Sequence, residues 1–198
     1  NSLKGKKRKS ILKERREANN SGVVFKRLTG DSLQLEHAQV IFEFYKNTIS
    51  KMNAIPYLNL NFFEDMIQRM KDRILWCVAE KDGEIVAGAL NFLKGDKIFG
   101  RYWGCSEDIK HLHFELCYYQ AIEYAIENNF QLFEAGAQGE HKLGRGFLPR
   151  FTYSAHKIAH PEFSEAIRKF IEEEAVQLRH NLSRENEFSP YKNSIGIS

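Results

Sequence analysis

Two apolar stretches joined by an Asp-Gly pair constrain the fold of this chain more than any other feature. Residues 74–81 and 84–93 are rich in β-branched and other apolar residues, as strands are. Asp82-Gly83 separates them, and such a pair is a strong hairpin signal because both central residues of a type I′ turn need a positive φ. A second turn leads to another strand-like stretch at residues 98–103. The middle of the chain is therefore predicted to form an antiparallel meander.

Helical and strand-like stretches flank this meander. Apolar residues recur at helical spacing over residues 33–52 and 62–73, and Asn59 is a candidate N-cap of the second helix. Further elements are predicted as strands at residues 23–28, 130–135 and 151–158 and as helices at residues 112–128 and 162–180. Small residues at 87–89 predict a bulge or a close backbone approach. Helices combined with mainly antiparallel strands predict an α+β fold.

Composition indicates a globular protein from a reducing compartment. The chain has 198 residues, of which 42% are hydrophobic and 13% aromatic, and this is enough for a core. Its three cysteines, Cys77, Cys105 and Cys117, are far apart and form no CxxC pair, which argues against a disulfide framework or a structural zinc site. No apolar run approaches the roughly 20 residues that span a bilayer, and no signal peptide is evident. We therefore expect a cytoplasmic protein without a transmembrane segment.

Basic residues concentrate at the start of the chain. Residues 1–17 hold eight Lys or Arg and two Glu, a net charge of +6, which leaves −3 for the remainder. A helix here would be polar on nearly every side, so it is either a solvated linker, which we favour, or a segment that binds RNA or phosphate. The cations that would make such contacts are Lys6, Lys7, Arg8, Lys9, Arg15 and Arg16.

The expected organisation is a basic linker helix at residues 1–20, one domain at residues 21–182 and a flexible tail at residues 183–198. The sequence starts without Met and inside the predicted helix. We therefore expect a piece of a longer protein.

Residues 135–149 form a polar segment after a predicted strand. Four glycines alternate there with an amide, a carboxylate, an imidazole and two cations. Such groups need hydrogen-bond partners when they are buried, and glycines let a backbone approach a ligand closely. A solvated loop is the alternative to a binding or catalytic segment, and the surrounding sequence favours the second.

The order of the predicted elements is that of the GNAT acyltransferase fold, and several motifs resemble the FemAB-like family of that superfamily. The motifs are residues 100–104 (GRYWG), 112–120 (LHFELCYYQ), 133–142 (FEAGAQGEHK) and 145–149 (RGFLP), with weaker likeness at residues 7–16 and 42–45. The resemblance implies an acyl-CoA N-acyltransferase fold with a mixed, mainly antiparallel sheet flanked by helices. It also implies the C-terminal lobe of a two-lobed protein, with a first GNAT-like lobe missing, in peptidoglycan biosynthesis or recognition.

The resemblance leaves the acyl donor open between acyl-CoA and aminoacyl-tRNA. Ordinary GNAT enzymes hold the CoA pyrophosphate in a glycine-containing loop at a helix N-terminus. Residues 104–113 occupy that place here, lack the glycine pattern and include two acids. Fem-type enzymes lack the same loop and use aminoacyl-tRNA, for which the basic segment from Lys4 to Arg16 is a candidate contact.

Candidate site residues follow from the chemistry that either donor requires. An amine must lose a proton and attack a carbonyl, and the resulting oxyanion must be stabilised. The candidate catalytic residues are Glu134, Glu140 and His141 as bases and Tyr102 as a proton donor. The candidate substrate-binding residues are Arg101, Glu115, Gln138, Lys142, Arg145 and His156. The acceptor is expected to be the amine of a small molecule or a peptide.

Three functions remain open from the sequence. The first is an acyl or aminoacyl transferase that acts on an amine of a cell-envelope precursor. The second is a non-catalytic lobe that recognises peptidoglycan-like or nucleic-acid ligands, and the third is an acetyl-CoA-dependent N-acetyltransferase. A zinc site built from His111, His113, Glu115, His156 and His160 is a weaker alternative, and we expect no metal.

Overall fold

The structure, a computed structural model, divides the chain into two units. It describes residues 2–136, 140–187 and 189–192, and for residue 140 and residues 183–187 it describes the backbone alone. One unit comprises residues 10–138, and the other comprises residues 1–9 and 139–198. The domain boundaries that the sequence suggests, at residues 20 and 182, stay predictions.

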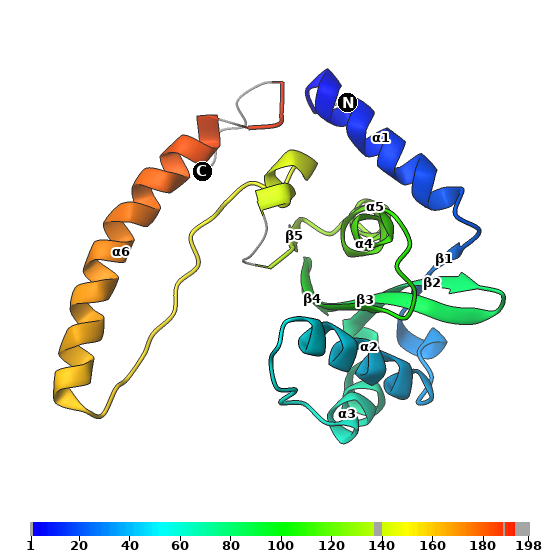
Figure 1. Cartoon of the computed structure of the whole chain (residues 1–198), viewed down its shortest axis with the longest axis horizontal. Coiled ribbons are helices and arrows are strands. Elements are labelled where there is room, and N and C mark those ends of the chain that lie inside the picture. Colours follow the sequence, from blue (N-terminus) through cyan, green and yellow to red (C-terminus); the bar gives the residue numbers. More distant parts are fainter. Residues whose placement is uncertain (1, 137–139, 188, 193–198) are drawn as a thin grey trace. The chain divides into compact units, whose positions relative to one another are not determined.

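A curled sheet forms the centre of the unit of residues 10–138 (Figure 1). Within the described residues it has five strands in the order β1-β2-β3-β4-β5. Neighbouring strands are antiparallel, except that β5 runs parallel to β4. The strands are β1 (Val24–Leu28), β2 (Ile74–Lys81), β3 (Glu84–Lys94), β4 (Lys97–Cys105) and β5 (Leu132–Glu134). The predicted hairpin is confirmed, since Asp82 and Gly83 have φ values of 52° and 88°.

Helices cover both faces of this sheet. Helices α2 and α3 pack on one face, and the helical run from α4 to α5 packs on the other (Figure 1). The helices of both units are α1 (Gly5–Asn19), α2 (His37–Lys51), α3 (Leu60–Met70), α4 (Leu112–Phe114), α5 (Gln120–Glu127) and α6 (Pro161–Glu187). Shorter turns are η1 (Gly30–Ser32), η2 (Lys71–Arg73), the π-helical η3 (Glu115–Tyr119) and η4 (Glu140–Arg145). The predicted α+β, GNAT-like architecture is therefore confirmed.

Local sequence signals explain the helices α2 and α3. The Asn59 side chain accepts a hydrogen bond from the Phe62 amide (3.0 Å), as a helix N-cap does. The apolar stripes of both helices are buried against the sheet around Trp76. Met52 and Met70, at the ends of these helices, are exposed. The close approach predicted at residues 87–89 is confirmed at Gly88, where a Cβ atom would lie 2.4 Å from the Trp76 indole nitrogen.

The unit of residues 1–9 and 139–198 brings the start of the chain to its C-terminal segment. Leu3 forms an antiparallel bridge with Tyr191, and the Lys4 amide donates to the Pro190 carbonyl (2.8 Å). The Tyr191 hydroxyl donates to the carbonyl of Gly146 (2.7 Å), which ties η4 to the same bridge. Helix α6 follows a long irregular segment and reaches residue 187, beyond the predicted end at residue 180.

The strand predicted at residues 151–158 is wrong. These residues have no regular secondary structure, and Tyr153 is 92% exposed. A strand needs a neighbour for its backbone groups, and this segment has none among the described residues. None of the helices in the described part of the chain is both long and apolar enough to cross a bilayer.

Candidate functional site

Strand β4 carries a bulge at Arg101. Tyr102 pairs with Leu90 of β3, whereas the next residue of β3, Asn91, pairs with Gly100. Arg101 is therefore the extra residue, without a partner on β3. The buried Asn91 side chain supports the bulge by donating to two backbone carbonyls of β2 and β3, each at 3.1 Å. A bulge re-aims the side chains that follow it, and bulges are common beside active sites.

Strand β5 separates from β4 directly before this bulge. The two strands pair only at residues 97–99 of β4, although β4 continues to Cys105. Beyond Phe99, that edge of β4 has no strand partner within the described residues. One carbonyl there, that of Trp103, accepts a hydrogen bond from the Thr48 hydroxyl of α2 (2.6 Å). The remaining open edge presents backbone polar groups that a substrate is able to bind.

The bulge places Arg101 and Tyr102 in one cluster with Tyr57. The Arg101 guanidinium lies 4.7 Å from the centre of the Tyr102 ring and donates to the Tyr57 hydroxyl (3.2 Å). The hydroxyls of Tyr57 and Tyr102 are 2.8 Å apart. Tyr45 supports the cluster from below, because its ring meets the Tyr102 ring edge-on at 5.1 Å and its hydroxyl accepts from the Tyr57 amide (2.9 Å). We call Arg101, Tyr57 and Tyr102 the β4 cluster.

The environment of Tyr102 keeps its hydroxyl protonated. Burial, followed by the hydrogen bond with Tyr57, raises the pKa of Tyr102 to about 12, and the charge of Arg101 opposes this shift. The phenol therefore carries its proton at neutral pH, as a group that protonates a leaving atom must.

Two substitutions are expected to move the Tyr102 pKa in opposite directions. Tyr57→Phe removes the hydrogen bond that raises the pKa, so the pKa should fall below about 12. Arg101→Met removes the nearby positive charge, so the pKa should rise. Alkaline titration of tyrosine labelled with ¹³C at Cζ, followed by NMR, measures both. Shifts of the same sign in the two variants would contradict this arrangement.

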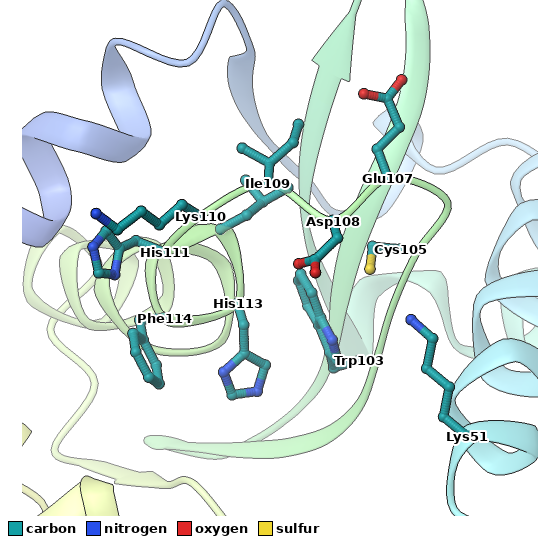
Figure 2. A pocket seen from close by; sticks show the side chains of 11 residues that line it. Lys51, Trp103, Cys105, Glu107, Asp108, Ile109, Lys110, His111, His113 and Phe114 are labelled. Carbon is teal, nitrogen blue, oxygen red and sulfur yellow. The ribbon is translucent and has the colours of Figure 1, made fainter.

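A pocket of about 250 Å³ lies at the end of β4 (Figure 2). Trp103 and Cys105 of β4, the loop at residues 107–111 and the first turn of α4 line it, with Lys51 at the end of α2. The Trp103 and His113 rings meet edge-on at 5.1 Å in its wall. Much of its lining comes from residues 104–113, the segment at the place of the pyrophosphate loop of ordinary GNAT enzymes, whose glycine pattern it lacks.

Glu115 is buried, and both of its carboxylate oxygens accept hydrogen bonds. Its carboxylate accepts from the Arg15 Nε (3.1 Å) and Nη2 (2.9 Å) atoms and from the Gln120 amide (2.8 Å). Arg15 also bonds Glu123 (2.5 Å). Burial alone would lower the pKa of Arg15, but the hydrogen bonds with Glu123 and Glu115 outweigh it and the pKa is raised. These contacts favour a structural role for Glu115 over substrate binding, and they remove Arg15 from the cations that could bind RNA.

The other three predicted catalytic residues, Glu134, Glu140 and His141, are not part of the β4 cluster. Glu134 ends β5 opposite Phe99, and its side chain is exposed, without the burial expected of a base. The Glu140 side chain lies outside the described residues. His141 belongs to the other unit, where burial and then the charges of Arg145 and Lys142 lower its pKa, so its ring is neutral at pH 7.

The predicted substrate-binding residues are likewise divided. Gln138 lies outside the described residues. Lys142, Arg145 and His156 belong to the same unit as His141, where Arg145 donates to the His141 carbonyl (3.0 Å) and His156 lies 2.9 Å from the Ser154 hydroxyl. In the unit of residues 10–138, the predicted site residues that the structure brings together are Arg101 and Tyr102. In the other unit, Arg145 and His141 are in contact.

Comparison of the sequence with protein families identifies the family of this chain. It matches the FemAB-like family, described as one of peptidoglycan biosynthesis and recognition, over residues 1–193. The chain belongs to the FemAB-like family. No curated protein matches it.

Solved structures share the fold of this FemAB-like chain. FemX superimposes with a TM-score of 0.50 and 13% identity over 64% of this chain and 46% of FemX. L-PGS from Bacillus licheniformis gives a TM-score of 0.51 and 15% identity over 67% of this chain and 42% of L-PGS. An aminoglycoside acetyltransferase from an uncultured soil metagenomic sample gives a TM-score of 0.48 and 10% identity, over 71% of this chain and 97% of the acetyltransferase. The chain therefore spans less than half the length of FemX and of L-PGS.

Sequence reasoning missed several residues of this candidate site. Tyr57 stands in the loop between α2 and α3, where an aromatic residue after a proline was the available signal. Lys51 lines the pocket without any motif that would mark it, and Trp103 lies in the motif at residues 100–104 but was not chosen as a site residue. In the described part of the chain, no three His, Cys, Asp or Glu side chains gather as metal ligands would.

Proposed function

We propose that this FemAB-like chain acts in the transfer of an acyl or aminoacyl group to an amine, with a peptidoglycan precursor as the acceptor. The observation that carries the proposal is the open edge of β4, where β5 separates and the bulge displays Arg101 beside Tyr102. The family description and the fold shared with FemX support it. Aminoacylated donors are made in the cytoplasm, and the three free cysteines fit that reducing compartment.

The β4 cluster suits the chemistry of this transfer. The acceptor nitrogen forms a bond to the donor carbonyl carbon, and the bond from that carbon to the leaving oxygen or sulfur breaks. Arg101, at the open edge, stabilises the negative charge that develops on the carbonyl oxygen. Tyr102 gives its proton to the leaving atom. The amine proton goes to Glu134, the candidate base that belongs to the same unit as the cluster.

Aminoacyl-tRNA is the donor that we favour over acyl-CoA. The segment at residues 104–113 lacks the glycine pattern of a pyrophosphate loop. The cations Lys6, Lys7, Arg8, Lys9 and Arg16 are exposed on α1, where they are able to contact phosphates. Gln138, Lys142, Arg145 and His156 remain candidate contacts to the acceptor or the donor.

Arg101→Ala is expected to lower transfer about 100-fold, the effect of losing one group that stabilises an oxyanion. The assay supplies a peptide amine with charged tRNA or with acetyl-CoA, and mass spectrometry detects the product. Arg69→Ala is the matched control, because Arg69 is an exposed arginine of α3 paired with Asp65. Undiminished transfer by the Arg101 variant would contradict the proposed role. Transfer from acetyl-CoA alone would overturn the choice of donor.

A recognition lobe without catalysis is the second candidate. The exposed cations of α1 favour it because they suit binding of an anion. The exposed side chain of Glu134 also favours it, because this carboxylate lacks the burial expected of a catalytic base. Salt-sensitive binding of tRNA or of peptidoglycan fragments, with no product from either donor, would support this function over transfer.

A further inference from the structure

The charged residues around the β4 pocket are not all satisfied by the protein. The Glu107 carboxylate pairs with Lys81 (2.6 Å). Lys110 and His111 both pair with Glu17 of α1, at 2.7 and 3.3 Å. These three lining residues therefore have protein partners.

Lys51 and Asp108 are the exceptions. Both residues are exposed, and neither side chain forms an ion pair or a hydrogen bond with the residues that the structure describes, although both charges act on the nearby Cys105 thiol. Both line the pocket together with Trp103, and Figure 2 shows Lys51 extending from α2 toward Trp103 and Cys105. The pocket thus offers one carboxylate, one ammonium group and an aromatic wall to a ligand.

The volume of the pocket limits the size of the ligand that it is able to enclose. Its volume of about 250 Å³ is below the roughly 300–1,000 Å³ of sites that enclose a whole drug-sized ligand or cofactor. A small group with an ammonium and a carbonyl or carboxyl a few bonds apart complements Asp108, Trp103 and Lys51. An α-amino-acyl group has this chemistry.

We propose that the pocket binds the aminoacyl group of the donor, with its α-ammonium on Asp108 and Trp103 and its carbonyl side toward Lys51. The inference rests on the proposed transfer function and specifies its donor. The carboxylate forms a charge-assisted hydrogen bond, and the indole face adds a cation–π contact. The positive charge of Lys51 repels the ammonium and so fixes which end of the group lies near it.

The same chemistry excludes the acceptor amine as the occupant. A carboxylate and an indole face stabilise the protonated form of an amine. The attacking amine must be unprotonated, whereas the α-amine of the donor takes no part in the reaction and stays charged. Acetyl-CoA has no ammonium at this position, so Asp108 selects aminoacyl over acetyl donors.

The test uses adenosine that carries alanine in a stable amide linkage at the 3′ position, and the same compound with its amine acetylated. Calorimetry should show about ten- to hundredfold tighter binding of the free-amine compound, the effect of one charge-assisted hydrogen bond. Asp108→Asn should abolish that preference by weakening binding of the free-amine compound alone. Lys51→Met should weaken the binding of both compounds. Asp82→Asn, in the exposed hairpin turn, is the matched control and should leave the affinity for both compounds unchanged.

The outcomes separate this inference from the proposed function. Equal binding of the two compounds, or an unchanged preference in Asp108→Asn with native circular dichroism, overturns the pocket assignment. No binding of either compound, combined with transfer that depends on Arg101, also overturns it but leaves the function standing. A preference lost in Asp108→Asn without any transfer keeps the pocket and removes the function. Displacement of the alanyl compound by a peptide with a free amine, but not by its acetylated form, assigns the pocket to the acceptor instead.

Discussion

Gly104→Ala is expected to destabilise the unit of residues 10–138 by about 3 kcal/mol, the upper part of the range for overpacked cores. A Cβ atom at Gly104 would lie 2.3 Å from the Phe44 carbonyl oxygen and 2.4 Å from the Phe44 Cβ. The first of these atoms belongs to the backbone of α2, so a rotamer change is unable to relieve the contact. Urea unfolding followed by circular dichroism measures the loss.

Gly5→Ala is the control for that substitution. A Cβ atom at Gly5, the first residue of α1, meets nothing within 4 Å, and alanine favours a helix over glycine by roughly 0.5–1 kcal/mol. The variant should be as stable as the wild type or slightly more so. If Gly104→Ala were equally harmless, α2 and β4 would not be packed as closely as the structure shows.

The close packing at Gly104 matters for the β4 cluster. It lets α2 approach β4 so that Thr48 reaches the Trp103 carbonyl and Tyr45 reaches the Tyr102 ring. A folded but loosened Gly104 variant should therefore also lose the raised pKa of Tyr102, because burial is its largest cause. Stability and site geometry are coupled through one glycine.

The strands and helices of the sheet-containing unit were predictable because their signals are local. The Asp82-Gly83 turn, the apolar stretches on either side of it and the Asn59 cap each depend on residues a few positions apart. The structure confirms all three. The same reasoning failed for the strand at residues 151–158, because a strand exists only where another strand accepts its hydrogen bonds.

The candidate site was predictable only in part. Arg101 and Tyr102 were chosen from the sequence. Their side chains lie together because Arg101 is an extra, bulged residue in the pairing of β4 with β3. A register is set by the pairing of β3 with β4, which no local pattern in β4 reveals. Tyr57 joins from a loop 44 residues away from Arg101 and was missed for the same reason.

Glu115 shows how a nonlocal partner changes an interpretation. A carboxylate near a helix start reads as a ligand contact or a cap when the sequence alone is considered. The structure supplies Arg15, 100 residues earlier in the chain, and buries the carboxylate against it. Arg15 in turn ceases to be a solvated cation of a linker, and the end of α1 becomes part of the packed unit.

Arg15→Met is accordingly expected to destabilise this unit by about 3–5 kcal/mol, because it leaves the buried Glu115 charge without its main partner. Arg15→Met combined with Glu115→Leu should recover most of that loss, since the pair is then replaced by apolar groups of similar size. Arg69→Met breaks an exposed pair with Asp65 and should cost at most about 1 kcal/mol. Urea unfolding of the single and double variants gives the coupling energy between the two sites.

The double variant decides whether α1 is a linker or part of the domain. If α1 is held by this buried pair, the single variant should also expose α1 to proteolysis near residue 15, and the double variant should restore its protection. A single variant as stable as Arg69→Met would mean that Glu115 finds enough support in Gln120 alone. The helix would then be the solvated linker that its polar sequence suggests.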